Sequence, residues 1–520
     1  MIHKFRKINV PLLIITMLGL LLRVFKLDAK SLWLDEAFTV AFAQKDWGTI
    51  FFHHYSIRPL YFMIVKCWAS LFGYTEFNLR MLSVVFGTLS IIMLYRLGKL
   101  LFNKKIGLFC ALLLALSAYH VIRSQQARWY SLAMLLFIST AFCLLQLRRK
   151  PKLFYWIAYP VSLLMLVYTN PFIGGMVFLL TNCFLFLFKI DLKRWMSMQA
   201  VIILLASILL IPVLNHYNIE IENDKYCPIV NENIFKMLIE DFSYGRVLSQ
   251  AGVGGYLDTN RPWITKCGFY MILGLTYLVF LRFLLCKRKS EQKIKFNDGF
   301  TILWFFIPFG IFGIVNLFVA FSRWSKIAII LLPAFCLLVG RMFLSLRKDI
   351  SRLLIGFFVL SYSINLVYYY YAPNQDSWRE IAFLVKKNMQ KGDSIVFFPM
   401  AQITPFWYYY KYNEPRQLKD IGDSFFGKTR KINDKWVKEF YDKDNLITGF
   451  ELGNIPANCD EVFNPLVRRH AFWIVVSPDW YGRENMRKLK LGLQKNYKLE
   501  KESRFVWDGV EVLYYKPDSL

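Results

Sequence analysis

The chain has 520 residues, of which 56% are hydrophobic and 18% aromatic, and its formal net charge at pH 7 is +28. A soluble globular protein averages about 45–50% apolar residues. Here the excess is concentrated in runs of roughly 18–22 residues, long enough to cross a hydrocarbon core of about 30 Å. The composition therefore argues against a soluble protein. The basic residues cluster in short loops between the runs, which indicates membrane orientation and not a nucleic-acid partner.

The apolar runs predict an α-helical polytopic membrane protein with about eleven transmembrane helices. These cover residues 8–26, 79–101, 106–122, 129–147, 153–170, 172–189, 198–215, 265–286, 300–321, 325–344 and 352–371. The first run is not expected to be a cleaved signal, because no small-residue cleavage site follows it. Basic loops follow every second run, which predicts that their side is cytoplasmic. The opposite, exterior side then receives the long first loop, residues 27–78.

Within that loop, residues 59–72 are apolar and aromatic but too short to span, so we expect a helix in the membrane interface. The spans predict a membrane domain over residues 1–371 and an exterior α/β domain over 372–520. Alternating short apolar runs and helical patterns carry this second prediction. Its expected elements are a helix from Ser377 with a capping-box spacing, strands over 394–398 and 472–476, a basic helix over 483–494, and a last strand over 510–515.

An acidic pair, Asp35 and Glu36, follows the first run directly, in a chain that keeps acids out of its other predicted spans. Its neighbours are apolar, so we expect the pair at a protein or membrane surface. Burial and a second carboxylate would raise a carboxyl pKa toward the value that a general base needs near neutral pH. We therefore predict that Asp35 and Glu36 are catalytic. A solvated pair in a loop is the alternative.

Isolated cations gather on the same predicted side of the membrane. They are Arg58, Arg123, Arg128, Arg323 and Lys326. Because Arg binds phosphate through two parallel hydrogen bonds, cations beside a carboxylate at a membrane surface suit a lipid phosphate as the leaving group. The segment 123–130 could instead be an interfacial turn, with Arg side chains reaching the headgroups and aromatic anchors beside them.

Metal binding and ion-coupled transport are weaker hypotheses. Glu36, His53 and His54 are candidate ligands for a divalent metal ion, but adjacent histidines on a helix point in different directions, and surface histidines are the alternative. Ion-coupled transporters usually place carboxylates near the membrane midplane. Their absence from the predicted spans argues against transport coupled to protons or sodium.

Several segments, in this order, resemble the GT-C glycosyltransferases of the protein-O-mannosyltransferase and aminoarabinose-transferase kind, loosely family 39. The acidic pair resembles the signature after the family's first span. Residues 58–87 are similar to its "HPPLYY…LFG…E…RLPS…G" block and residues 112–132 to its "LLALSP…SQEARMYSL" block. Residues 322–340 and 376–399 resemble its late "RYL…P" segment and the start of its exterior domain.

The resemblance implies an inverting glycosyltransferase in the cell inner (plasma) membrane, with its active site and C-terminal domain on the exterior, periplasmic face. The donor would be a polyprenyl-phosphate-linked sugar and the acceptor a lipid, glycan or protein. Asp35 would deprotonate the acceptor hydroxyl, and Glu36 would orient the acceptor or Asp35. The residues expected to bind the donor phosphate are Arg58, Arg128, Arg323 and Lys326, and those expected to contact substrate are Gln126, Tyr130 and Tyr61.

The chain departs from the family pattern at four positions. The family's first-loop His is Ile57 and its first Pro is Arg58, while Gln126 and Ala118 replace its Glu and a second Pro. If that His or Glu bound a metal in relatives, this chain would do without one. Three alternatives stay open: a polysaccharide polymerase or ligase, a transporter or flippase of lipid-linked sugars, and a non-catalytic assembly protein.

Overall fold

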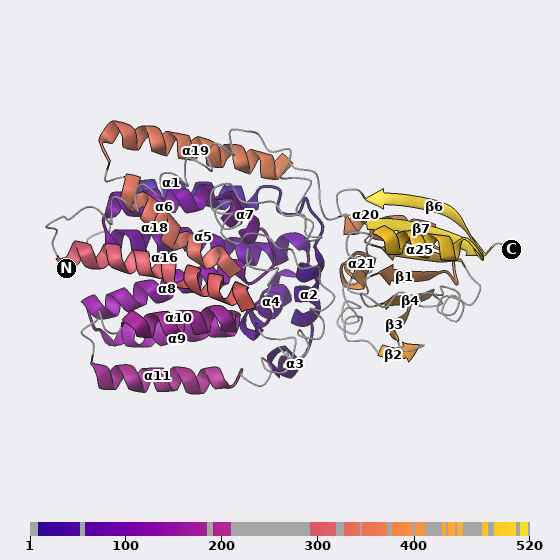
Figure 1. Ribbon diagram of the computed structural model, residues 1–520, viewed down its shortest axis with the longest axis horizontal. Coiled ribbons are helices and arrows are strands. Elements are labelled where there is room, and N and C mark those ends of the chain that lie inside the picture. Colours follow the sequence, from indigo (N-terminus) through magenta and orange to yellow (C-terminus); the bar gives the residue numbers. More distant parts are fainter. Residues whose placement is uncertain are drawn as a thin grey trace.

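The fold is a long bundle of helices with a mixed β-sheet at one end, where the C-terminal part of the chain lies (Figure 1). This computed structural model describes residues 9–52, 58–184, 191–209, 292–318, 327–343, 346–371, 377–398, 402–410, 429–432, 435–442, 445–450, 471–476, 483–505 and 510–517.

The bundle is built from apolar helices and a 3-10 turn, η3. In chain order these are α1 (Val10–Val24), α2 (Leu34–Ala43), α3 (Trp47–Phe52), α4 (Pro59–Phe72), α5 (Glu76–Leu101), α6 (Lys104–Leu116), α7 (Ala118–Ser124), α8 (Tyr130–Arg149), α9 (Leu153–Thr169), α10 (Pro171–Cys183), α11 (Leu192–Ser207), α16 (Gln292–Phe318), η3 (Ala328–Leu331), α18 (Leu332–Phe343) and α19 (Lys348–Tyr371).

Among the described residues, four helices are long and apolar enough to cross a membrane, and a fifth span results if α6 and α7 are counted as one. The four lie in α5, α8, α16 and α19. Shorter apolar helices, such as α1 and α9, pack beside them. Each predicted span coincides at least in part with a described helix, except 265–286, which lies outside the described residues.

The predicted span over 106–122 differs from the structure, because the chain bends by 63° between α6 and α7. Ser117 at the break has extended backbone, and its side chain accepts a hydrogen bond from the amide of His120. Arg23 of α1 donates to the carbonyl oxygens of Leu114 and Ala115, which the break leaves without helical partners. A serine cap and a buried guanidinium therefore stabilise the bend.

Helix α4 confirms the helix predicted over residues 59–72. It begins at Pro59 and ends at Gly73, whose φ of 83° favours glycine. From its middle, the Lys66 ammonium donates to the carbonyl oxygens of Ala43 and Lys45, at distances of 3.3 and 2.6 Å. These carbonyls close the C-terminal end of α2, so α4 fixes that end of the helix that carries the acidic pair.

The described residues of the C-terminal part form a seven-stranded sheet of order β2-β3-β4-β1-β5-β7-β6, in which β1 runs parallel to β4 and β5 and the other pairs are antiparallel. Its elements are α20 (Trp378–Asn388), β1 (Ser394–Phe398), α21 (Ile403–Tyr410), β2 (Thr429–Ile432), β3 (Lys435–Asp442), β4 (Asn445–Phe450), β5 (Phe472–Val476), α25 (Arg483–Leu493), β6 (Tyr497–Phe505) and β7 (Val510–Pro517). The strands and the basic helix predicted here are confirmed.

The two faces of this sheet belong to different cores. Ile395 and Phe397 of β1 join the core that continues into the bundle, whereas Val396 and Phe398 pack in a separate core with α25. This alternation follows from the two-residue period of a strand. One face of the sheet therefore connects, through α20 and α21, to the helical bundle.

Helices α5 and α6 approach each other closely, and glycine permits it. A Cβ at Gly107 would lie 2.6 Å from the carbonyl oxygen of Tyr95 and 2.9 Å from the amide of Lys99. Gly107→Ala should therefore lower the free energy of unfolding by about 1–3 kcal/mol through overpacking. Thermal unfolding of the detergent-purified protein measures the effect.

Gly175→Ala is the matched control, because a Cβ at Gly175 of α10 meets open space. For this variant we expect no loss of stability, and the free energy of unfolding should rise by up to about 1 kcal/mol because alanine has the higher helix propensity. A Gly107→Ala variant as stable as the Gly175→Ala variant would contradict the close packing of α5 and α6.

Candidate functional site

The acidic pair lies in the first turn of α2, at the end of the bundle that faces the sheet (Figure 1). Trp33 caps the helix, and its amide donates to Oε2 of Glu36 at 3.4 Å. A carboxylate at this position is favoured because the first amides of a helix lack partners and carry partial positive charge. The local sequence thus places Asp35 and Glu36 on successive positions of one helical turn, pointing in different directions.

Glu36 is buried and held by Arg80 of α5. The guanidinium donates to both carboxylate oxygens, with Nε–Oε1 at 2.9 Å and Nη2–Oε2 at 2.7 Å. The amide of Ala127 donates to Oε1 at 2.7 Å. Glu36 therefore joins three segments: α2, α5 and the turn between α7 and α8.

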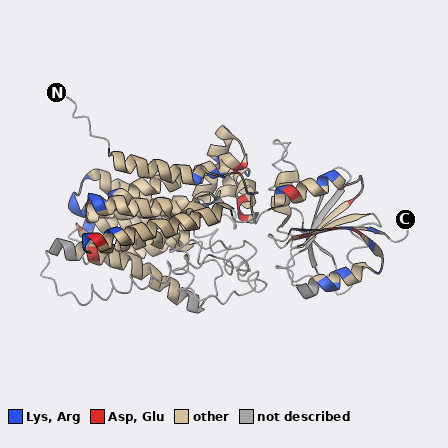
Figure 2. Cartoon of the chain, turned by 90° about the horizontal axis from the view of Figure 1, so that it is seen from above, with Lys and Arg blue, Asp and Glu red and all other residues tan. Residues whose placement is uncertain are grey.

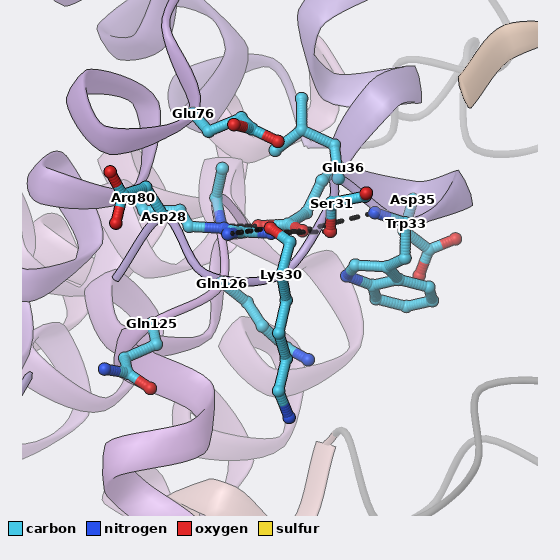
Figure 3. Close-up of polar contacts among 12 residues, drawn as sticks. Asp28, Lys30, Ser31, Trp33, Asp35, Glu36, Glu76, Arg80, Gln125 and Gln126 are labelled. Carbon is cyan, nitrogen blue, oxygen red and sulfur yellow. Dashed lines mark hydrogen bonds and ion pairs between the residues drawn. The ribbon is translucent and has the colours of Figure 1, made fainter. Parts of the chain in front are cut away.

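The remaining N–H groups of Arg80 donate hydrogen bonds to the segment before α2. Nη1 donates to the carbonyl oxygens of Leu27 and Lys30, and Nη2 to that of Ser31, at 2.7–2.9 Å. A guanidinium has five N–H donors, and here all five have acceptors. Arg80 thus fixes the backbone of residues 27–31 as well as Glu36 (Figure 3).

Asp35 has a different environment from its neighbour. Its side chain is 28% exposed, against 1% for Glu36. Figure 3 shows its carboxylate turned away from the Glu36–Arg80 pair. A carboxylate that is oriented by its helix yet open to approach has the accessibility that a general base requires.

The cation nearest to Asp35 is Arg128, from the turn before α8. Its Nη2 lies 3.7 Å from Oδ2 of Asp35, and its Nη1 donates to the Asp35 carbonyl oxygen at 2.8 Å and to Oγ1 of Thr39 at 3.0 Å. The Nε of Arg128 is buried without a hydrogen-bond partner among the described residues. Burial lowers the pKa of Arg128, but the charge of Asp35 together with the nearby Tyr130 and Tyr61 outweighs burial and raises the pKa, so the guanidinium stays charged.

The structure brings the other predicted residues of segment 123–130 close together. Oε1 of Gln126 accepts a hydrogen bond from Arg123 at 3.2 Å. The Arg123 guanidinium lies over the ring of Tyr130, which is buried. Tyr61 is also buried, and its hydroxyl lies 3.0 Å from that of Ser83, which donates to the Arg128 carbonyl oxygen. Tyr61 and Tyr130 therefore support the turn from within the protein core.

Arg58, at the start of α4, lies with its guanidinium 5.2 Å from the ring of Trp129, the residue after Arg128. The remaining predicted site residues lie outside the described residues: His53, His54, Arg323 and Lys326. In the described part of the chain, no three His, Cys, Asp or Glu side chains are grouped as a metal site would need. Glu36 would have to give up bonds to Arg80 and Ala127 to become a ligand.

Sequence reasoning missed Arg80 as a site residue. A signal was available in the sequence. Arg80 is a cation one turn into an apolar helix, at the end predicted to be exterior, where the positive-inside rule does not place cations. A charge in such a position needs a buried partner.

We predict that Arg80→Gln destabilises the protein by about 3–5 kcal/mol, because it leaves Glu36 as a buried, uncompensated charge. Arg80→Lys should also destabilise the protein, since a single ammonium group cannot replace the five hydrogen bonds that the planar guanidinium donates. The control is Arg194→Gln, which removes an exposed partner of Asp191 and should change stability by less than about 1 kcal/mol. Thermal unfolding measures all three. Equal stability of Arg80→Gln and Arg194→Gln would contradict the assignment.

Comparison with known proteins identifies the fold. Residues 56–216 match the family model described as dolichyl-phosphate-mannose-protein mannosyltransferase, and no curated protein matches the chain. The structure of ArnT from Cupriavidus metallidurans bound to undecaprenyl phosphate is similar with a TM-score of 0.53 and 12% identity, over 96% of this chain and 97% of that one. AglB, an oligosaccharyltransferase from Archaeoglobus fulgidus in complex with an inhibitory peptide and a dolichol-phosphate, is similar with a TM-score of 0.50 and 13% identity, over 94% and 72%. The chain therefore shares the overall fold of these two structures.

Proposed function

We propose that this protein is an inverting glycosyltransferase that moves a sugar from a polyprenyl-phosphate donor to an acceptor hydroxyl at the exterior face of the membrane. The observation that carries the proposal is the pairing of Asp35, oriented and partly exposed, with Arg128, whose buried guanidinium keeps an Nε–H without a described partner. A base for the acceptor and a cation for the leaving phosphate thus lie side by side. Both are needed for glycosyl transfer from a lipid phosphate.

In the proposed reaction, Asp35 takes the proton of the acceptor hydroxyl as its oxygen attacks the anomeric carbon. The bond between that carbon and the phosphate oxygen breaks in the same displacement, so the configuration inverts and the lipid phosphate departs with the bonding electrons. Negative charge grows on this phosphate in the transition state. Arg128 would stabilise it by a charge-assisted hydrogen bond, and Arg58, Arg323 and Lys326 remain further candidates.

We propose that Glu36 acts through position, not by contact with substrate. Its two oxygens already accept hydrogen bonds from Arg80 and from the Ala127 amide. These bonds set the distance between the helix that carries Asp35 and the turn that carries Arg128. Of the two roles predicted for Glu36, orientation of Asp35 is the one these contacts favour.

The exterior location of the site rests on charge. Lys and Arg gather at the end of the bundle away from the sheet (Figure 2), and cations concentrate on the cytoplasmic side of membrane proteins. We infer that the site and the sheet lie on the exterior side of an inner or plasma membrane, with residues 372–520 as an exterior domain. The lipids named for ArnT and AglB, undecaprenyl phosphate and dolichol-phosphate, give the chemical class of donor carrier proposed here.

Asp35→Asn should abolish transfer of labelled sugar from a polyprenyl-phosphate-linked pool in membranes, because the amide cannot accept the hydroxyl proton. Asp46→Asn is the matched control: Asp46 is an exposed carboxylate of the same loop that caps α3 through Thr49, and asparagine also caps helices well. At equal expression, Asp46→Asn should transfer like the wild type. Full transfer by Asp35→Asn would favour the transporter or non-catalytic alternatives, which do not depend on this carboxylate.

Arg128→Gln should weaken binding of undecaprenyl phosphate by the purified protein, measured as the loss of ligand-induced thermal stabilisation. Arg128→Lys should bind the lipid more weakly than the wild type and more tightly than Arg128→Gln, since it keeps the charge but loses the planar guanidinium. Arg149→Gln, at the other end of α8, should bind like the wild type. If Arg128→Gln and Arg149→Gln bind the lipid equally, Arg128 does not hold the phosphate.

A further inference from the structure

The C-terminal helices α20 and α21 hold the segment that leads into α2. The amide of Leu32 donates to the hydroxyl of Tyr409 in α21. The Arg379 side chain of α20 donates to the carbonyl oxygen of Asp28 at 3.1 Å. Residues about 350 positions later in the chain thus bind the backbone just before the acidic pair.

Glu76, at the start of α5, connects these contacts. Its Oε1 accepts a hydrogen bond from the Tyr409 hydroxyl, and its Oε2 pairs with Nη2 of Arg379 at 2.5 Å. The Glu76 side chain is 8% exposed. A carboxylate shielded to this degree needs its partners, because leaving it unpaired would cost its desolvation free energy.

At the N-terminus of α20, a contact with the segment before α2 takes the place of the expected side-chain cap. The sequence predicts that Ser377 caps this helix, but its side chain makes no capping hydrogen bond. Instead, the amide of Arg379 donates to Oγ of Ser31 at 3.2 Å. A first-turn amide, which a local cap would normally satisfy, is satisfied by the segment before α2.

Glu76 and Arg80 lie four residues apart, and therefore on one face of α5. Arg80 binds Glu36 and three carbonyl oxygens of the segment before α2, those of Leu27, Lys30 and Ser31. Tyr409 and Arg379, anchored on Glu76, bind the same segment through its amide, carbonyl and hydroxyl groups. Burial raises the pKa of Tyr409, as does the charge of Glu76, so its hydroxyl stays protonated and can donate.

We propose that Glu76, Arg379 and Tyr409 are positioning residues for the transfer reaction, which hold residues 28–32 so that Asp35 faces the acceptor. The inference rests on the proposed function in one respect, namely that Asp35 is the base. It adds that the C-terminal part of the chain is required for the base to be in place. Displacement of a reacting group by about 1 Å can cost about 100-fold in rate.

The test is Tyr409→Phe in the full-length protein, which keeps the ring and removes the hydroxyl that joins Leu32 to Glu76. Tyr410→Phe is the matched control on the same helix, because that hydroxyl contacts Met389 at 3.5 Å, within the C-terminal part. Arg379→Gln is a second variant: the Arg379 side chain is 44% exposed, and Glu76 keeps the hydrogen bond from Tyr409 in this variant. Purification in detergent and equal thermal unfolding establish that each variant is folded.

Three measurements are compared: hydrogen exchange of peptides covering residues 28–36, sugar transfer from the polyprenyl-phosphate pool, and binding of undecaprenyl phosphate. We expect Tyr409→Phe and Arg379→Gln to raise exchange in these peptides and to lower transfer by about 10- to 100-fold. Lipid binding should be unchanged, because Arg128 is not touched. Tyr410→Phe should match the wild type in all three.

Unchanged exchange in Tyr409→Phe would overturn the proposal, because the segment would then be ordered without this contact. Raised exchange with full transfer would overturn it also, since Asp35 would not depend on the order of the segment. Failure of the proposed function has a separate signature, equal transfer by the wild type and Asp35→Asn. In that case the positioning role falls with it, while the exchange data still decide whether α20 and α21 order the segment.

Discussion

The site depends on one buried ion pair, that between Glu36 and Arg80. Taking two charges out of water costs several kcal/mol each, and their attraction offsets this only when the geometry is good and the remaining donors and acceptors are satisfied. Here both carboxylate oxygens and all five guanidinium N–H groups have partners. The pair therefore links α2, α5, the segment before α2 and the turn before α8 in one arrangement.

The ion pair explains why two adjacent carboxylates differ in their exposure to solvent. Successive residues of a helix point about 100° apart, so only one of the pair can face Arg80. Glu36 faces inward and is buried, and Asp35 is left partly exposed beside Arg128. The same backbone turn thus supplies one buried structural carboxylate and one that is partly exposed to solvent.

The C-terminal part also holds the loop before α2 through hydrogen bonds, from residues much farther along the chain. Its sheet is joined to the bundle by α20 and α21, whose polar groups bind the amide of Leu32, the carbonyl oxygen of Asp28 and the hydroxyl of Ser31 in the loop before α2. Loop backbone away from water needs such partners. The packing of α20 and α21 against this loop therefore satisfies hydrogen bonds of its backbone and limits the conformations open to Asp35.

The amino-acid sequence by itself determined the apolar helices of the bundle, the helix from Pro59, the buried strands β1 and β5, and the acidic pair as the candidate site. Each depends on local periodicity, caps or apolar runs, which short segments encode. Only the tertiary structure decided the bend between α6 and α7, the different surroundings of Asp35 and Glu36, and the roles of Arg80, Glu76 and Tyr409. These depend on partners 44 to 377 positions apart, and no local pattern specifies which distant donor will satisfy a given acceptor.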